Sequence, residues 1–338
     1  MNTLRAFLFI SAAALIATAT PTGAADAPRY RIIERIKVPD GGFDYATFDA
    51  ATARVYMPRG DFTTIVDVKT SRVSRLDSGA SDHIALPIPG TSLLILTQRR
   101  GIIRIADAAK DMVLADLLGG KNPNSAAYDP VSKLVFVMNK DSGDAAVIDP
   151  VTQKFVATIP ISPNTLEFPV ADGAGRIFDN IETTAEIAVI DARTRKVTGS
   201  YRLAGCEEPS GLAYAADSKL LISSCGNGVA KIVEAETGKD VATVPIGRGP
   251  DAVIYDARRK LAFIPCGRDG VLEVISLADP AHIVVVQHVA TQAGTRTGTL
   301  DPATGKLYLM AFKTDPKPVP RGRPARLPGS FEVLVVGP

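Results

Sequence analysis

Short apolar runs, and runs in which apolar and polar residues alternate, recur along this chain of 338 residues. Leu134–Asn139 reads LVFVMN and Ala145–Asp149 reads AAVID, and the turn sequence Asp149-Pro150 begins directly at the end of the second run. Such runs, rich in Val, Ile, Tyr and Phe and bounded by turn residues, predict β-strands. Asp followed by Pro favours a type I turn, in which the Asp side chain also bonds its own backbone. Helical periodicity is absent after the N-terminal segment, so the pattern predicts an all-β chain.

These strands belong to a repeat of about 42 residues. The segment Tyr128–Asn139 returns as Tyr214–Cys225, Tyr255–Cys266 and Leu300–Phe312. An acidic residue follows a later strand of the repeat at Asp67, Asp107, Asp149, Asp191 and Glu234, with separations of 40, 42, 42 and 43 residues. A fixed period of this length is typical of stacked supersecondary units. Seven units result, and they start near Phe43, His83, Asn124, Thr165, Ser210, Asp251 and Thr297.

Seven units of four short strands predict a seven-bladed β-propeller with four-stranded antiparallel blades, in one domain over residues 29–338. The last unit supplies only three strands, whereas Tyr30–Val38 is a strand that belongs to no unit. We expect this N-terminal strand to be the outer strand of the last blade and so to close the ring. A linear solenoid would leave it unpaired, which disfavours that architecture.

The units resemble the YVTN-type repeat family of exported bacterial and archaeal propellers. The resemblance lies in the patterns D-x-x-x-x-K-L-x-V/F-x-x and V-I-D-x-x-T-x-K-V-x-x-T-I, and it covers nearly all of the chain after the N-terminal segment. The chain has no Trp, so the signature of WD40 repeats is missing. The resemblance implies a propeller architecture and leaves the activity open.

The N-terminal segment predicts export. Arg5 precedes an apolar stretch from Ala6 to Ala19, and small residues follow around Ala24, as in a signal peptide over residues 1–24. The apolar stretch is too short to favour a membrane span. We therefore expect a periplasmic protein without a membrane span. The net charge of +2 gives no general attraction to nucleic acid or membranes, and we expect a monomer.

The three cysteines fit an oxidising compartment. Cys206 precedes the first strand of the fifth unit and Cys225 ends its second strand, and antiparallel pairing brings these places together. We expect a Cys206–Cys225 disulfide bond, with Cys266 one blade further on and free. A soft-metal site made by the three thiols is the weaker alternative.

Polar residues precede the innermost strand of every predicted blade. In a propeller these loops, together with the loops that join second and third strands, lie on one face, here called the channel-mouth face. The residues in register are Asp44-Tyr45, Asp82-His83, Asn124-Ser125, Leu166-Glu167, Ser210-Gly211, Asp251-Ala252 and Arg296-Thr297. They either cap strand ends around a water-filled channel or form a ligand pocket. In the second case the carboxylates raise each other's pKa or hold a divalent cation such as Ca²⁺, although no cofactor is required.

A basic, proline-rich loop over residues 313–329 interrupts the last blade on the same face. Loops of this length without regular structure are usually functional or disordered. It is either a mobile insertion or a basic arm that attracts an anionic ligand or partner. The residues that would contact the partner are Lys317, Arg321, Arg323 and Arg326.

The predicted function is that of an exported scaffold, not an enzyme, which binds a small ligand or a periplasmic protein at the channel-mouth face. The chain contains no haem, zinc-helix, P-loop or nucleophile-elbow motif. The alternative is a metal-assisted hydrolase or lyase of the lactonase type, with His83 as the base. Nucleic acid is not an expected partner, because no aromatic residues interleave the charges of the basic arm.

Overall fold

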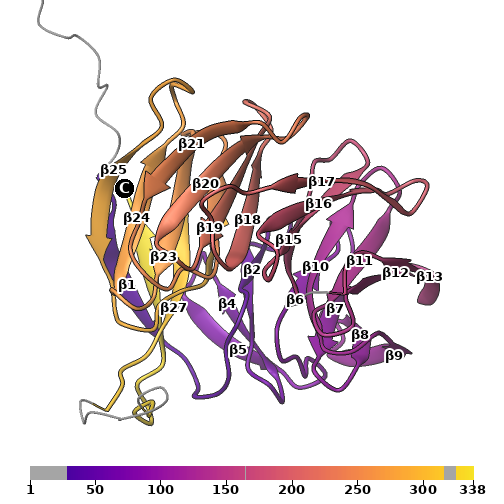
Figure 1. The fold of residues 1–338 in the computed structure, drawn as a ribbon. Coiled ribbons are helices and arrows are strands. Elements are labelled where there is room, and N and C mark those ends of the chain that lie inside the picture. The colour runs from indigo at the N-terminus through magenta and orange to yellow at the C-terminus, as the bar shows by residue number, and fades with distance from the viewer. Residues whose placement is uncertain (1–28, 164, 316–324) are drawn as a thin grey trace, which may run out of the picture.

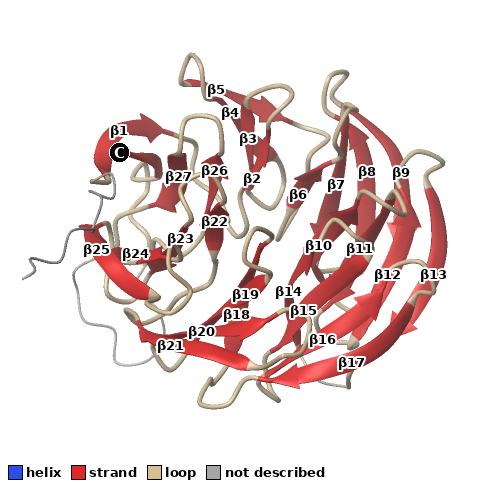
Figure 2. Cartoon of the chain, turned by 90° about the horizontal axis from the view of Figure 1, so that it is seen from above, coloured by secondary structure: helices blue, strands red, loops and turns tan. Residues whose placement is uncertain are grey.

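The computed structural model describes residues 29–163, 165–315 and 325–338. These residues form seven four-stranded antiparallel sheets and contain no helix. Viewed from above, the sheets stand as blades around a common centre (Figure 2). Six blades are continuous in sequence, and the seventh combines strands from both ends of the described chain, which lie side by side in Figure 1. The predicted seven-bladed β-propeller is confirmed.

Each blade has the same strand order from the centre outward. The innermost strands of blades 1 to 7 are β2 (Thr47–Asp49), β6 (Ala85–Pro87), β10 (Pro123–Asp129), β14 (Leu166–Ala171), β18 (Pro209–Ala215), β22 (Ile254–Asp256) and β26 (Gly298–Asp301). The second strands are β3 (Arg54–Pro58), β7 (Leu93–Gln98), β11 (Leu134–Asn139), β15 (Arg176–Ile181), β19 (Leu220–Cys225), β23 (Leu261–Cys266) and β27 (Lys306–Ala311). The third strands are β4 (Thr63–Asp67), β8 (Ile102–Asp107), β12 (Asp144–Asp149), β16 (Glu186–Asp191), β20 (Val229–Glu234), β24 (Val271–Ser276) and β28 (Glu332–Gly337). The outer strands are β5 (Arg72–Leu76), β9 (Met112–Leu118), β13 (Lys154–Pro160), β17 (Lys196–Arg202), β21 (Asp240–Pro245), β25 (Val284–Ala290) and β1 (Arg31–Lys37).

The recurring acidic residue is a turn residue. Asp149 Oδ1 accepts hydrogen bonds from the backbone N–H groups of Val151 and Thr152, at 2.9 and 3.0 Å. Gln153 then adopts a left-handed conformation with φ of 59°, which ends the turn before β13 begins. These local bonds explain the repetition of Asp without any catalytic role.

The hydrophobic core lies between neighbouring blades, because the middle strands are apolar on both faces. Along β11, Val135 and Val137 pack against blade 2, whereas Phe136 and Met138 pack against blade 4. All four side chains are fully buried. Successive residues of a strand point to opposite faces, so every middle strand serves two interfaces.

One carboxyl group lies inside this core. Asp179, on β15, is fully buried, and neither of its oxygens has a hydrogen-bond partner among the described residues. Burial therefore raises the pKa of Asp179 well above its usual value. Its protonated form is the one that the interior favours.

The N-terminal strand closes the ring as predicted. β1 pairs antiparallel with β28, with Ile36 opposite Val333. Tyr30, directly before β1, is buried and packs its ring 4.8 Å from that of Phe263 in blade 6. The N-terminal strand thus completes blade 7, and Tyr30 packs this strand against blade 6. The predicted signal peptide, residues 1–24, lies outside the described residues.

Removing residues 29–38 should lower the thermal stability and promote aggregation. The deletion takes away three buried side chains, Tyr30, Ile36 and Val38, each worth about 1.5–3 kcal/mol. It also exposes the edge of β28, which can then pair with other chains. Thermal unfolding and light scattering test this. The substitution Glu34→Ala, at an exposed position of β1, should behave as the wild type. Equal stability of the deletion variant would show that β1 does not hold the ring closed.

Candidate functional site

Several of the predicted residues meet at the mouth of the central channel. Tyr45, from the loop before β2, is 3% exposed, and its ring lies 4.5 Å from that of Phe168 in blade 4. Blades 1 and 4 lie across the ring from each other, so the Tyr45 side chain spans the channel. Burial raises the pKa of Tyr45 well above its usual value, and the nearby carboxylates of Asp251, Glu167 and Asp44 raise it further. Carboxylates from three blades therefore surround one phenol.

Hydrogen bonds between blades hold these loops in place. The Thr297 hydroxyl of blade 7 donates to the carbonyl oxygen of Asp44 in blade 1, at 2.7 Å. The Ser125 hydroxyl of blade 3 donates in the same way to the carbonyl oxygen of Glu167 in blade 4. In blade 4, the Asn180 amide donates to the carbonyl oxygen of Ser210 in blade 5, at 3.0 Å. The sequence offers Ser125 and Thr297 as residues that cap strand ends or line a pocket, and their hydroxyls join neighbouring blades.

His83 is held between two side chains. Its Nδ1 lies 2.6 Å from Asp44 Oδ2, and its Nε2 lies 3.1 Å from Asn122 Oδ1. The imidazole is buried, and the two contacts fix its orientation. Asn122 was not predicted from the sequence. It adopts a left-handed conformation with φ of 56°, which Asn tolerates better than most residues.

Glu167 is paired with a lysine that the sequence analysis also missed. Lys140, at the end of β11, forms an ion pair with Glu167, and its Nζ lies 3.4 Å from Glu182 Oε2. Burial raises the pKa of Glu167 well above its usual value, and Lys140 opposes this effect. One feature of the sequence points to Lys140: it lies in a loop between a second and a third strand, and these loops belong to the channel-mouth face.

Asp251 is paired with Arg296 from the next blade. The Arg296 Nε donates to Asp251 Oδ2 at 2.5 Å, and the guanidinium also lies over the ring of Phe43. Burial raises the pKa of Asp251 to about 6, and Asp44 adds to the effect, whereas Arg296 lowers it. The mouth of the channel thus contains acidic side chains paired with basic side chains of neighbouring blades.

Three predicted residues lie apart from this set. The Asp82 carboxylate accepts a hydrogen bond from the backbone N–H of Arg99, at 2.9 Å, and so caps the turn between β7 and β8. Asn124 is buried, and its side-chain oxygen has no partner among the described residues. The Ser210 hydroxyl lies 3.3 Å from the carbonyl oxygen of Pro250, a further contact between blades.

The carboxylates that the sequence offered for a cation lie beside basic side chains, and the cation site stays a prediction. Within residues 29–163, 165–315 and 325–338, no group of three or more His, Cys, Asp or Glu side chains is placed to hold a metal ion. Asp44 faces His83, Glu167 faces Lys140, and Asp251 faces Arg296. These three carboxylates therefore each have a basic group of the chain itself beside them.

The base of the basic arm is ordered on the same face. Asp315 N–H donates to the carbonyl oxygen of Ala325, and Leu327 N–H to that of Lys313, both at 2.8 Å. Arg326 is thereby placed above an aromatic cluster. The predicted arm residues Lys317, Arg321 and Arg323 lie outside the described residues.

The aromatic cluster consists of Phe43, Phe312 and Phe331, with ring centres 5.2 to 6.4 Å apart. The Arg326 guanidinium lies 4.8 Å from the centre of Phe312, and Arg59 lies 4.5 Å from that of Phe331. Burial lowers the pKa of Arg59 to about 10. Cation–π contacts therefore fix the base of the arm to the junction of blades 7 and 1.

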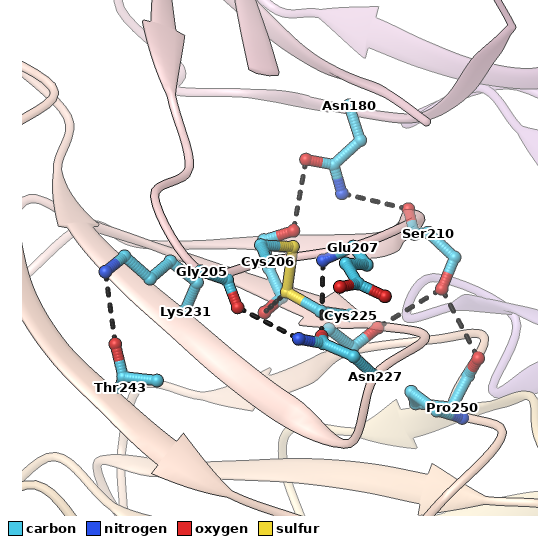
Figure 3. The surroundings of a disulfide bond; sticks show 12 residues. Asn180, Gly205, Cys206, Glu207, Ser210, Cys225, Asn227, Lys231, Thr243 and Pro250 are labelled. Atoms are coloured by element: carbon cyan, nitrogen blue, oxygen red, sulfur yellow. Dashed lines mark hydrogen bonds between the residues drawn. A yellow bond between two sulfur atoms is a disulfide. The ribbon is translucent and has the colours of Figure 1, made fainter. Parts of the chain in front are cut away.

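A disulfide bond joins Cys206 to Cys225, the pair expected from the sequence, with 5.4 Å between the Cα atoms (Figure 3). It fastens the loop before β18 to the end of β19. Asn227 supports the same loop, because its amide donates to the carbonyl oxygen of Gly205 at 3.0 Å. Cys266 is free and buried.

No known protein-family model and no curated protein matches the chain. Its fold is similar to a chain of the mitotic checkpoint complex, with 14% identity, a TM-score of 0.72, and coverage of 92% of this chain and 96% of that one. It is similar to U3-55K, with 9% identity, a TM-score of 0.75, and coverage of 89% and 98%. It is similar to Kuenenia stuttgartiensis hydrazine synthase, with 17% identity, a TM-score of 0.68, and coverage of 81% and 94%. These likenesses support the β-propeller fold alone, and the YVTN-type assignment stays a prediction.

Thiol counting on the denatured, unreduced protein should find one free thiol, that of Cys266. The substitution Cys266→Ser should reduce the count to zero. Cys206→Ser together with Cys225→Ser should lower the free energy of unfolding by about 3 kcal/mol, because the bond closes a loop of about 20 residues. Three free thiols in the wild type would contradict the disulfide.

Replacing Asp251 with Asn should change the pH dependence of stability. The raised pKa means that the folded protein binds a proton more tightly than the unfolded chain, so wild-type stability falls as the pH rises from about 4 to about 6. The difference in unfolding free energy between wild type and Asp251→Asn should therefore decrease by about 2–3 kcal/mol between pH 4 and 7. Chemical denaturation at several pH values measures it.

The matched control is Asp67→Asn. Hydrogen bonds from Thr70 lower the pKa of Asp67, so its contribution is present above the unfolded pKa and is lost as the pH falls through the folded one. The two variants should thus respond to pH with opposite sign. A constant difference for Asp251→Asn would mean that Asp251 titrates as in the unfolded chain.

Proposed function

We propose that this chain is an exported scaffold that binds a protein partner through its channel-mouth face. The observation that carries the proposal is that Asp44, Glu167 and Asp251 each lie beside a basic side chain from a neighbouring blade, at a centre that the loops of the blades surround. A centre in which these carboxylates already have partners within the chain supports a rigid platform more than an open reaction site. The propeller fold in general supports protein binding. Among the described residues, no helix is long and apolar enough to cross a membrane.

The disulfide and the aromatic cluster support the same proposal. Cys206–Cys225 fixes a loop of blade 5, and Arg326 fixes the base of the arm at blades 7 and 1. Loops that are fixed before binding lose less conformational entropy when a partner docks. The ordered loops of the channel-mouth face are therefore suited to contact a folded partner.

The second candidate is the metal-assisted hydrolase or lyase, which one observation favours. The contact between Asp44 and His83 orients an imidazole in the way a general base requires. Holding a metal would, however, require Glu167 and Asp251 to give up Lys140 and Arg296. Metal analysis of the purified protein separates the two candidates, since bound divalent metal that supports hydrolysis would favour the enzyme.

Photo-crosslinking in cells that express the chain tests the scaffold. A crosslinking amino acid is placed at Thr183 or Arg268, both exposed on the channel-mouth face, in the loops between β15 and β16 and between β23 and β24. Controls carry it at Val151 and Arg193, exposed on turns of the opposite face. We expect a discrete adduct with one protein from the first pair only, in the exported cell fraction. Adducts from the control positions alone, or from no position, would contradict the proposal.

A further inference from the structure

A hollow of about 500 Å³ lies on the channel-mouth face between blades 2 and 3. Three loops form it: the turn between β7 and β8, the loop between β9 and β10, and the turn between β11 and β12. Arg99, Arg100, Lys121, Asn122 and Asp141 line it. Its volume falls in the range of small-molecule sites, about 300–1,000 Å³.

The floor of the hollow is held by backbone hydrogen bonds between the loops. Gly119 N–H donates to the carbonyl oxygen of Gly101 at 2.9 Å, and Lys140 N–H donates to that of Asn122 at 3.0 Å. Gly120 allows the close approach, because a Cβ atom there would overlap the Ser142 hydroxyl. The hollow is therefore formed before any ligand binds.

The charge of the hollow is not balanced. Among the described residues, no hydrogen bond or ion pair joins the side chains of Arg99, Arg100 and Lys121 to a carboxylate, whereas Arg104 on β8 holds Asp116 at 2.7 and 2.8 Å. Asp141 is the single carboxylate of the lining, against three cations. Positive charges that line one hollow repel each other, and a bound anion would offset this repulsion.

We propose that this hollow is a binding site for a small organic anion with two or more negative charges, carried on carboxylate or phosphate groups. Arg99 and Arg100 bring guanidinium forks, which match the geometry of both groups, and Lys121 adds a third charge. Asp141 and the Asn122 carboxamide can accept hydrogen bonds from a hydroxyl of the same ligand. The site goes beyond the proposed partner contact and does not depend on it.

The hollow is also connected to the channel mouth. Asn122 lines the hollow, and its Oδ1 lies 3.1 Å from His83 Nε2. A ligand that contacts Asn122 changes the environment of the His83 ring. This contact supplies a local reporter, because the chain has only three histidines and the other two, His282 and His288, have side chains that are 80% and 70% exposed elsewhere.

Calorimetric titration of the purified protein with citrate and with inorganic phosphate at low ionic strength tests the site. We expect saturable binding of at least one of them. The variant Arg99→Gln/Arg100→Gln/Lys121→Gln should bind at least tenfold more weakly. The control Lys69→Gln/Lys154→Gln/Arg193→Gln also loses three positive charges, but from exposed positions outside the hollow, and it should bind as the wild type does.

Nuclear magnetic resonance of the histidine rings locates the ligand. Binding should shift the His83 signals and leave those of His282 and His288 unchanged. The proposal is overturned if neither anion saturates the wild type, if both triple variants weaken equally, or if His83 does not respond. These outcomes are independent of the crosslinking experiment. If the anion site is disproved, the proposed partner contact is not affected.

Discussion

The antiparallel pairing of β1 with β28 is the interaction on which the remaining structure depends. Without it, blade 7 would have three strands, and the edge of β28 would be open. With it, the first described residues are held against the last strand, and the Tyr30 ring packs on blade 6 through Phe263. Closure turns seven similar sheets into a ring of defined circumference. Only a ring brings loops that lie far apart in sequence to one point.

The closed ring places charged side chains from several blades in a small space where they are largely buried. Such a space is costly for unpaired ions, and the chain meets this constraint with ion pairs such as Asp251–Arg296 and Glu167–Lys140. Tyr45 fills the centre between them and contacts Phe168 on the far side. The acidic and basic side chains at the centre therefore join neighbouring blades.

The sequence predicted the architecture well because the determinants are local and repeated. The number of blades follows from the turn aspartates and the apolar strands. The closure of the ring follows from the strand that precedes the first unit and belongs to none. The same register brought Asp44, His83, Glu167, Asp251 and Arg296 to one face. The basic partner of Glu167 could not be predicted. Lys140 lies in the loop between the second and third strands of blade 3, whereas Glu167 lies on the innermost strand of blade 4. Which side chains of two blades meet depends on the tilt of the blades, and the repeat pattern does not specify that tilt.

Two further residues show the limit of pattern reasoning. Asp179 sits in a strand whose alternation reads as ordinary core, and only the packing shows that its carboxyl has no partner. Asn122 reads as a loop residue, but its left-handed backbone aims its side chain at His83. Asn122 also lies between the channel mouth, which contains His83, and the basic hollow. On its inner side the carboxylates lie beside basic groups of neighbouring blades. On its outer side the side chains of Arg99, Arg100 and Lys121 have no carboxylate partner among the described residues. A bound anion would find uncompensated positive charge on the outer side of Asn122, which is where we propose the anion site.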